Sequence, residues 1–270
     1  MIASAEPPTR FGAALRVEWS RTITFPFETL STVGVNFVLV VVCWFFAPDW
    51  LVDQLFAVHR PLAFAVVLAS WMYADVPTTN VLGSNADRVV AMLDDAPALR
   101  QLFDARAFVL WCVVTPIAAI AAVYSGLASD HMVAAMGGLV WIVVAPAGLL
   151  MIGPLLGVVF PYHPEPLRER WAQRSQFWTH IVRWVALLVV PYVWVPAIGV
   201  VLMMPSLLIW HITSSSSLFT GGTFPHLLLG LSVGVSIHLG AAFAGRAWMV
   251  ALVRRRRVRL AAFLSDPKAG

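Results

Sequence analysis

Residues 84–108 read SNADRVVAMLDDAPALRQLFDARAF and form a polar segment between two apolar runs. The segment carries seven charged side chains, whereas the 270-residue chain is 60% hydrophobic and only 12% charged. Soluble domains average about 45–50% apolar and about 25% charged residues. The composition therefore indicates an integral membrane protein, with this polar segment outside the bilayer.

Outward from the polar segment, six apolar runs are long enough to cross a membrane. They cover residues 30–47, 60–79, 107–127, 132–160, 184–204 and 226–250. Prolines inside several of these runs are compatible with helices, because neighbouring helices satisfy the carbonyls that lose a donor. The sequence thus predicts an all-α membrane protein in which residues 30–250 form a six-helix transmembrane domain.

The arginines set the expected orientation. They lie before the first run and after every second run, as Arg10, Arg16, Arg21, Arg88, Arg100, Arg106, Arg168, Arg170, Arg174, Arg183, Arg254 to Arg257 and Arg259. The opposite side has only Arg60, beside Asp49, Asp53 and Asp130. The positive-inside rule then predicts a multi-pass protein of the plasma (inner) membrane with both termini in the cytoplasm.

The two flanks of the transmembrane domain differ in character. Residues 1–29 are expected to contain an amphipathic helix, because Phe11, Leu15 and Trp19 recur at i, i+4 and i+8. Such a helix is either a simple membrane anchor or a lever that contacts a cytoplasmic partner. Residues 251–270 form a basic tail, and RRRRVRL at 254–260 directly after an apolar run indicates an anionic-lipid anchor, not a nucleic-acid site.

Several kinds of site are missing from the sequence. The only lysine is Lys268, which lies outside any Walker A loop, so ATP would have to be bound by another chain. Cys43 and Cys112 lie in apolar runs and are interpreted as small buried apolar side chains, not as a disulfide or metal ligands. The histidines are scattered without metal-ligand spacing, and no metal site is predicted.

The sixth run contains GLSVG at 230–234, which matches the G-x-S-x-G of serine hydrolases. His238 lies six positions after Ser232, about 240° around a helix, so the two side chains do not share a face. Small residues at this spacing also let two helices approach closely, and this packing interpretation is preferred. His238 and Asp75 are the polar side chains within runs that either line a path or bond to another helix.

The polar segment itself predicts a helix, a break and a second helix. Ser84 or Asn85 is suited to cap the first helix, with Asp87 in its first turn. Its apolar side would hold Val89, Val90 and Leu93, and Asp94-Asp95 lead to the break at Pro97. The second helix, 98–108, is expected to run straight into the third apolar run.

With these features together, the chain resembles the permease subunits of type-2 ATP-binding-cassette (ABC) exporters. An amphipathic helix precedes the first run, and the inner loop reads acid, Leu, Pro and a basic position at Asp87, Leu93, Pro97 and Arg106. GPLLGVVFP at 153–161 precedes the second inner loop, and a partly apolar connection, 205–225, joins the last two runs. Arg106 departs from the usual Lys, and the loop at 161–183 is longer than expected.

The resemblance implies six spans, a second permease copy or paralogue, and a nucleotide-binding ATPase subunit that holds ATP and Mg²⁺. This chain would then carry no cofactor and no ATPase site, and it would move an amphipathic substrate, as in multidrug efflux. Residues 85–96 would be the coupling helix, and 8–25 the connecting helix with Phe11, Leu15 and Trp19. The coupling residues would be Asp87, Arg88, Val90, Leu93, Asp94, Asp95 and Pro97.

Two other functions remain open from the residues alone. A stand-alone carrier or channel would use the inner loops as solvated connectors, but it would favour inverted repeats or acidic pairs in the membrane, and neither is evident. A membrane-embedded hydrolase would use Ser232 as nucleophile. An adjacent reading frame with a Walker A motif would support the exporter, and an isolated gene would weaken that interpretation.

Overall fold

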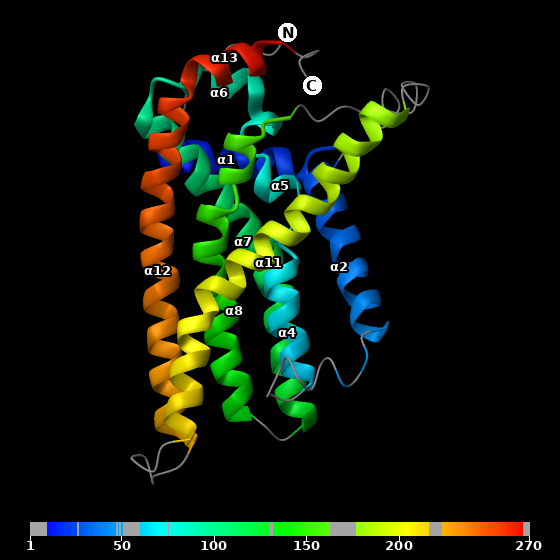
Figure 1. The fold of residues 1–270 in the computed structure, drawn as a ribbon, viewed down its shortest axis with the longest axis vertical. Coiled ribbons are helices and arrows are strands. Elements are labelled where there is room, and N and C mark those ends of the chain that lie inside the picture. The colour runs from blue at the N-terminus through cyan, green and yellow to red at the C-terminus, as the bar shows by residue number, and fades with distance from the viewer. Residues whose placement is uncertain are drawn as a thin grey trace.

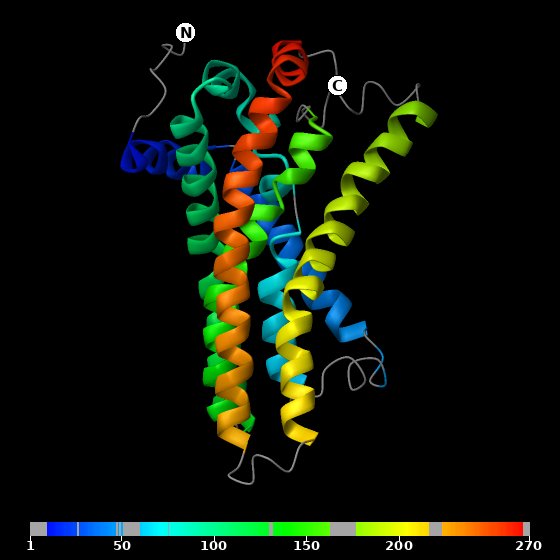
Figure 2. The same ribbon diagram turned by 60° about the vertical axis from the view of Figure 1, so that its left-hand side comes forward.

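The computed structural model describes residues 10–25, 27–46, 48, 50, 60–74, 76–129, 132–162, 177–215 and 223–266. Within these ranges all regular structure is helical. Long helices run side by side, and short helices gather at one end of the bundle, where α1 (Phe11–Ile23) lies across them (Figures 1 and 2). The all-helical architecture of the prediction is confirmed.

Five helical stretches in the described part of the chain are long and apolar enough to cross a membrane. They belong to α2 (Glu28–Phe46), α7 (Ala96–Ser129), α8 (Met132–Ile152) with the short α9 (Leu155–Val159), α11 (Phe177–Ser215) and α12 (Thr223–Arg255). Since α7 is continuous from Ala96, the expectation that 98–108 runs straight into the third apolar run is confirmed.

The second apolar run, 60–79, does not form one helix as expected. It forms α4 (Arg60–Trp71) and the short α5 (Val76–Thr79), separated by a turn. Pro77 has no N–H to bond the carbonyl of Tyr73, which favours a break here. Asn36 of α2 uses its side-chain amide to donate to the carbonyls of Trp71 (3.0 Å) and Met72 (3.2 Å), which satisfies the end of α4.

Part of the connection expected at 205–225 is helical in the structure. Helix α11 continues through Pro205 and ends only at Ser215, so LLIWHI at 207–212 is its last part. The hydroxyl of Ser206 donates to the carbonyl of Gly230 (2.6 Å), which ties α11 to α12. At the opposite end of the bundle α11 leans away from α12 (Figure 2).

Helix α8 is at the centre of the bundle. Its membrane-spanning stretch is 61% buried, whereas those of α2, α11 and α12 are each 22% buried. One core cluster joins α8 to α4, α7 and α11 through Leu68, Tyr73, Leu110, Val114, Ile142, Leu149 and Val195. The peripheral helices therefore leave most of their apolar surface for lipid or for another protein chain.

The GLSVG motif lies where α12 packs on α8. A Cβ atom at Gly234 would overlap the ring of Trp141, so glycine permits this close approach. Ser232 is exposed and donates to the carbonyl of Leu228 on its own helix (2.7 Å), whereas His238 is buried against α8. Ser232 and His238 thus lie on different faces of α12, as their spacing predicts.

Candidate functional site

The polar segment forms a compact group of short helices at one end of the bundle. A 3₁₀ turn, η1 (Gly83–Asn85), leads into α6 (Ala86–Met92). Asn85 and Ser84 do not cap α6 as predicted, because their side chains donate backward to the carbonyls of Val81 and Asn80 (both 2.9 Å). The backbone turn thus begins the helix, and Gly83 permits it, since a Cβ there would overlap the carbonyl oxygen of Tyr162.

Asp95 begins the next helix. Its carboxylate accepts a hydrogen bond from the backbone N–H of Ala98 (3.0 Å), three residues further on. This is the geometry of an N-cap, which satisfies one of the free N–H groups at the start of α7. The carboxylate of Asp95 is therefore engaged in a hydrogen bond within this chain. Pro97, two residues further on, is exposed.

A buried carboxylate, Glu18 of α1, joins the polar segment to the rest of the chain. Only 1% of its side chain is exposed. Its Oε1 lies 3.0 Å from Nη1 of Arg88 in α6, and its Oε2 lies 3.8 Å from Nη1 of Arg106 in α7. Arg21, one turn further along α1, lies 4.0 Å from the same carboxylate. These four residues are called the Glu18 cluster below.

Two further bonds hold the Glu18 cluster in place. Arg21 donates to the backbone carbonyl of Ser84 (2.6 Å), and Arg106 donates to the hydroxyl of Thr29 at the start of α2 (3.2 Å). A buried carboxylate is costly unless charged donors surround it. The cluster supplies those donors from α1, α6 and α7, so the three helices are tied at one point.

The orientation of α1 follows from the Glu18 cluster. Its inward stripe is Ala14, Glu18 and Thr22, all buried. Of the predicted connecting-helix residues, Phe11 and Trp19 are each 42% exposed and Leu15 is half-buried. Phe11 also contacts the exposed ring of Phe108 on α7 edge to face. The apolar side of α1 therefore faces away from the polar cluster that holds the helix.

A C-terminal helix covers the apolar side of α6. The residues expected only as a basic tail contain α13 (Arg257–Ser265), which the sequence analysis missed. Leu260 and Leu264 of α13 are buried in one cluster with Val89 and Leu93. Arg257 forms an exposed ion pair with Asp94. Around α6, the exposed side chains among the described residues include Ala91, Asp94 and Pro97, and Val90 is partly buried.

His238 bonds to another helix. Its Nδ1 lies 2.7 Å from the carbonyl oxygen of Ala145 in α8, and its ring meets Trp141 edge to face at 4.9 Å. Its Nε2 is buried and has no hydrogen-bond partner among the described residues. The other polar residue singled out in the membrane, Asp75, lies outside the described residues, as does the side chain of Asp87.

Sequence reasoning missed Glu18, Arg21 and Asn36. One signal for Glu18 was present, because it is the single acid of α1 and lies four residues from both Ala14 and Thr22. A stripe of small residues around one acid is typical of a face packed on protein. Its partners Arg88 and Arg106 are too distant in the sequence to be paired with it by pattern alone.

The described residues contain no group of three or more His, Cys, Asp or Glu side chains that could hold a metal ion. No protein family, curated protein or solved structure matches the chain. Function must therefore be inferred from the geometry of the Glu18 cluster and of the helices that it joins.

Proposed function

We propose that the chain is the membrane-spanning permease subunit of an ATP-driven exporter of the type-2 ABC class, with ATP and Mg²⁺ bound by a separate subunit. The observation that carries this proposal is the Glu18 cluster, which ties the transverse helix α1 to α6 and α7. A push on α6 would be passed through Arg88 and Glu18 to α1, and through the continuous helix α7 to the membrane.

The proposed topology has six spans and both termini in the cytoplasm. The described part of α4 has 12 residues, about 18 Å at about 1.5 Å per residue, and packs inside the bundle against α7 and α8 (Figure 1). Counted with the five longer stretches, it supplies the sixth span. The short helices and their arginines lie at one end, which the positive-inside rule assigns to the cytoplasm.

The surface that an ATPase subunit would contact is smaller in this proposal than the family resemblance implies. The family resemblance assigns Leu93 and Asp95 to coupling. Leu93 is covered by α13, and the carboxylate of Asp95 caps the N-terminus of α7. We therefore assign docking to the exposed side chains of Ala91, Asp94 and Pro97. Closure of the ATPase subunits would shift the permease only if they contact α6 differently in the two states.

Site-specific crosslinking tests this proposal. The expectation that both cysteines are buried is wrong for Cys43, which is exposed, and Cys112 is partly exposed. The background therefore carries Cys43→Ser and Cys112→Ala. Ala91→Cys is compared with Ala128→Cys, an exposed position at the other end of α7. After crosslinking in the host membrane, Ala91→Cys should yield an adduct with a Walker A protein, and Ala128→Cys should not.

The same experiment has a contrary outcome. The permease assignment is wrong if both measurements fail, that is, if no nucleotide-binding protein is crosslinked at Ala91→Cys and none purifies with the chain in mild detergent. Transport by the purified chain alone in vesicles without ATP would then favour the stand-alone carrier or channel.

A further inference from the structure

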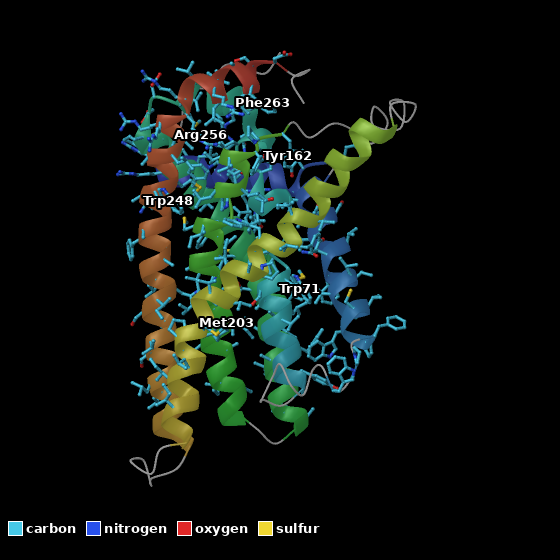
Figure 3. All side chains as sticks on the ribbon, viewed as in Figure 1. Trp71, Tyr162, Met203, Trp248, Arg256 and Phe263 are labelled. Carbon is cyan, nitrogen blue, oxygen red and sulfur yellow. The ribbon has the colours of Figure 1, made fainter. Side chains whose placement is uncertain are left out.

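A pocket of about 420 Å³ lies beside the start of α13, apart from the Glu18 cluster. Its walls are mostly apolar and include Leu156 of α9, Val190 and Pro191 of α11, and Phe263 of α13. Its volume falls within the range of about 300–1,000 Å³ that is usual for small-molecule sites. Figure 3 shows Phe263, Arg256 and Tyr162, which also lines the pocket, at this end of the molecule.

Two guanidinium groups give the pocket its charge. Arg256 and Arg259 both line it, and none of the described lining residues carries a carboxylate. Arg256 donates from Nη1 to the carbonyl of Val159 (3.4 Å), which leaves other N–H donors of its guanidinium available. Among the described residues neither arginine has an ion pair, whereas the neighbouring Arg257 is paired with Asp94. The pocket is therefore complementary to an anion.

The pocket lies at the depth where apolar helices end. The membrane-spanning stretches of α8–α9 and α12 end at Val159 and Arg255. Val159 and Arg256, at or next to these two limits, line the pocket. A ligand here would have its charged part among the lipid headgroups and its apolar part in the hydrocarbon.

We propose that this pocket binds an anionic phospholipid, with the phosphate held by Arg256 and Arg259 and an acyl chain along Leu156, Val190 and Pro191. A free phosphate would satisfy the two guanidinium groups but would leave the apolar wall unused. A lipid satisfies both the guanidinium groups and the apolar wall. The guanidinium groups donate paired hydrogen bonds to its phosphate, and the wall contacts its acyl chain in place of neighbouring lipids. This assignment does not depend on the permease proposal.

Native mass spectrometry of the detergent-purified full chain tests the assignment by titration with phosphatidylglycerol. Each guanidinium that donates to the lipid phosphate contributes about tenfold to affinity, so R256Q/R259Q should weaken binding about 100-fold. The matched control R254Q/R255Q removes the same charge from two exposed positions outside the pocket, where salt screens diffuse attraction, and it should change affinity by less than about twofold.

The single variant Arg259→Gln separates binding from folding, because its exposed side chain makes no ion pair among the described residues. It should weaken binding about tenfold. Equal losses in both double variants would overturn the proposal, since they would indicate diffuse attraction to the basic segment. Competition by millimolar inorganic phosphate at equal strength would overturn it as well, since the acyl chain would then contribute nothing.

Discussion

Glu18 is the residue that holds α1 against the polar end of the bundle. Its carboxylate faces three guanidinium groups, and one of them, Arg106, is itself only 7% exposed. Removing one partner of a buried ion pair costs about 3–5 kcal/mol, because the other charges stay buried without compensation. This exceeds the contribution of an exposed pair, about 0–1 kcal/mol, several-fold.

Glu18→Gln should therefore lower the free energy of unfolding by about 3–5 kcal/mol. Arg16→Gln, an exposed position of the same helix, is the control and should change it by less than about 0.5 kcal/mol. Denaturant unfolding of both variants in detergent measures the difference. Equal stabilities would mean that the Glu18 cluster does not hold α1.

The sequence predicted α1 but not the contacts of its polar side. Phe11, Leu15 and Trp19 show a helical apolar stripe, which in an interfacial helix faces lipid. The inward face is then the polar one, and its partner Arg88 is 70 residues away in the sequence. Local periodicity carries no information about a pair of that separation.

At the scale of elements, the short helices pack through glycine and leucine contacts. Helix α9 meets α5 at Gly157, where a Cβ atom would overlap the carbonyl oxygen of Thr79. Helix α13 meets α6 through Leu260 and Leu264. The ion pair between Arg257 and Asp94 is exposed at both ends, so the leucines contribute most of the attachment.

Gly157→Ala should lower the free energy of unfolding in detergent by about 1–3 kcal/mol, because the new methyl group would overlap backbone atoms that cannot move aside. Gly240→Ala is the matched control on α12, with no atom within 4 Å of its Cβ position. It should stabilise the protein by about 0.5–1 kcal/mol through helix propensity alone. Similar shifts in both variants would contradict the close packing of α9 on α5.

Leu264→Ala should detach α13 from α6, with a loss of about 2–5 kcal/mol in the stability of this contact. Hydrogen exchange should then become faster at Val89 to Leu93. Val258→Ala, at a position that is 77% exposed, should leave the exchange unchanged. Unchanged exchange in Leu264→Ala would show that α13 does not protect α6.

The long helices were more predictable from the sequence than the breaks between helices and the helix α13 that packs over α6. Long apolar runs identify α2, α7, α8, α11 and α12, because each must satisfy its backbone inside lipid. The break between α4 and α5 depends on Asn36 from another helix, and prolines elsewhere leave α11 unbroken. RRRRVRL was interpreted by its charge, although Leu260 and Leu264 four residues apart give α13 an apolar side.

At the scale of the whole molecule, α1, α6 and α13 lie at one end of the bundle, and the C-terminal end of α7 and the N-terminal end of α8 lie at the other (Figure 1). An impermeant maleimide should distinguish these ends in oriented vesicles. In the cysteine-free background, Ala91→Cys and Val258→Cys should react only from the cytoplasmic side, and Ala128→Cys only from outside. Labelling of all three from one side would contradict the proposed topology.

Helix α2 and its Asn36 have a consequence for the order in which the protein enters the membrane. At the break after α4, the carbonyl of Trp71 accepts from the backbone N–H of Ala74 and from Asn36, and the carbonyl of Met72 accepts from Asn36. A carbonyl left unsatisfied in lipid costs several kcal/mol. A ribosome makes the chain from its N-terminus, so α2 is released before α4. The side-chain amide that donates to these carbonyls is thus already present when α4 emerges. A variant such as Asn36→Leu would remove this donor, so we expect α4 to stay longer at the insertion machinery.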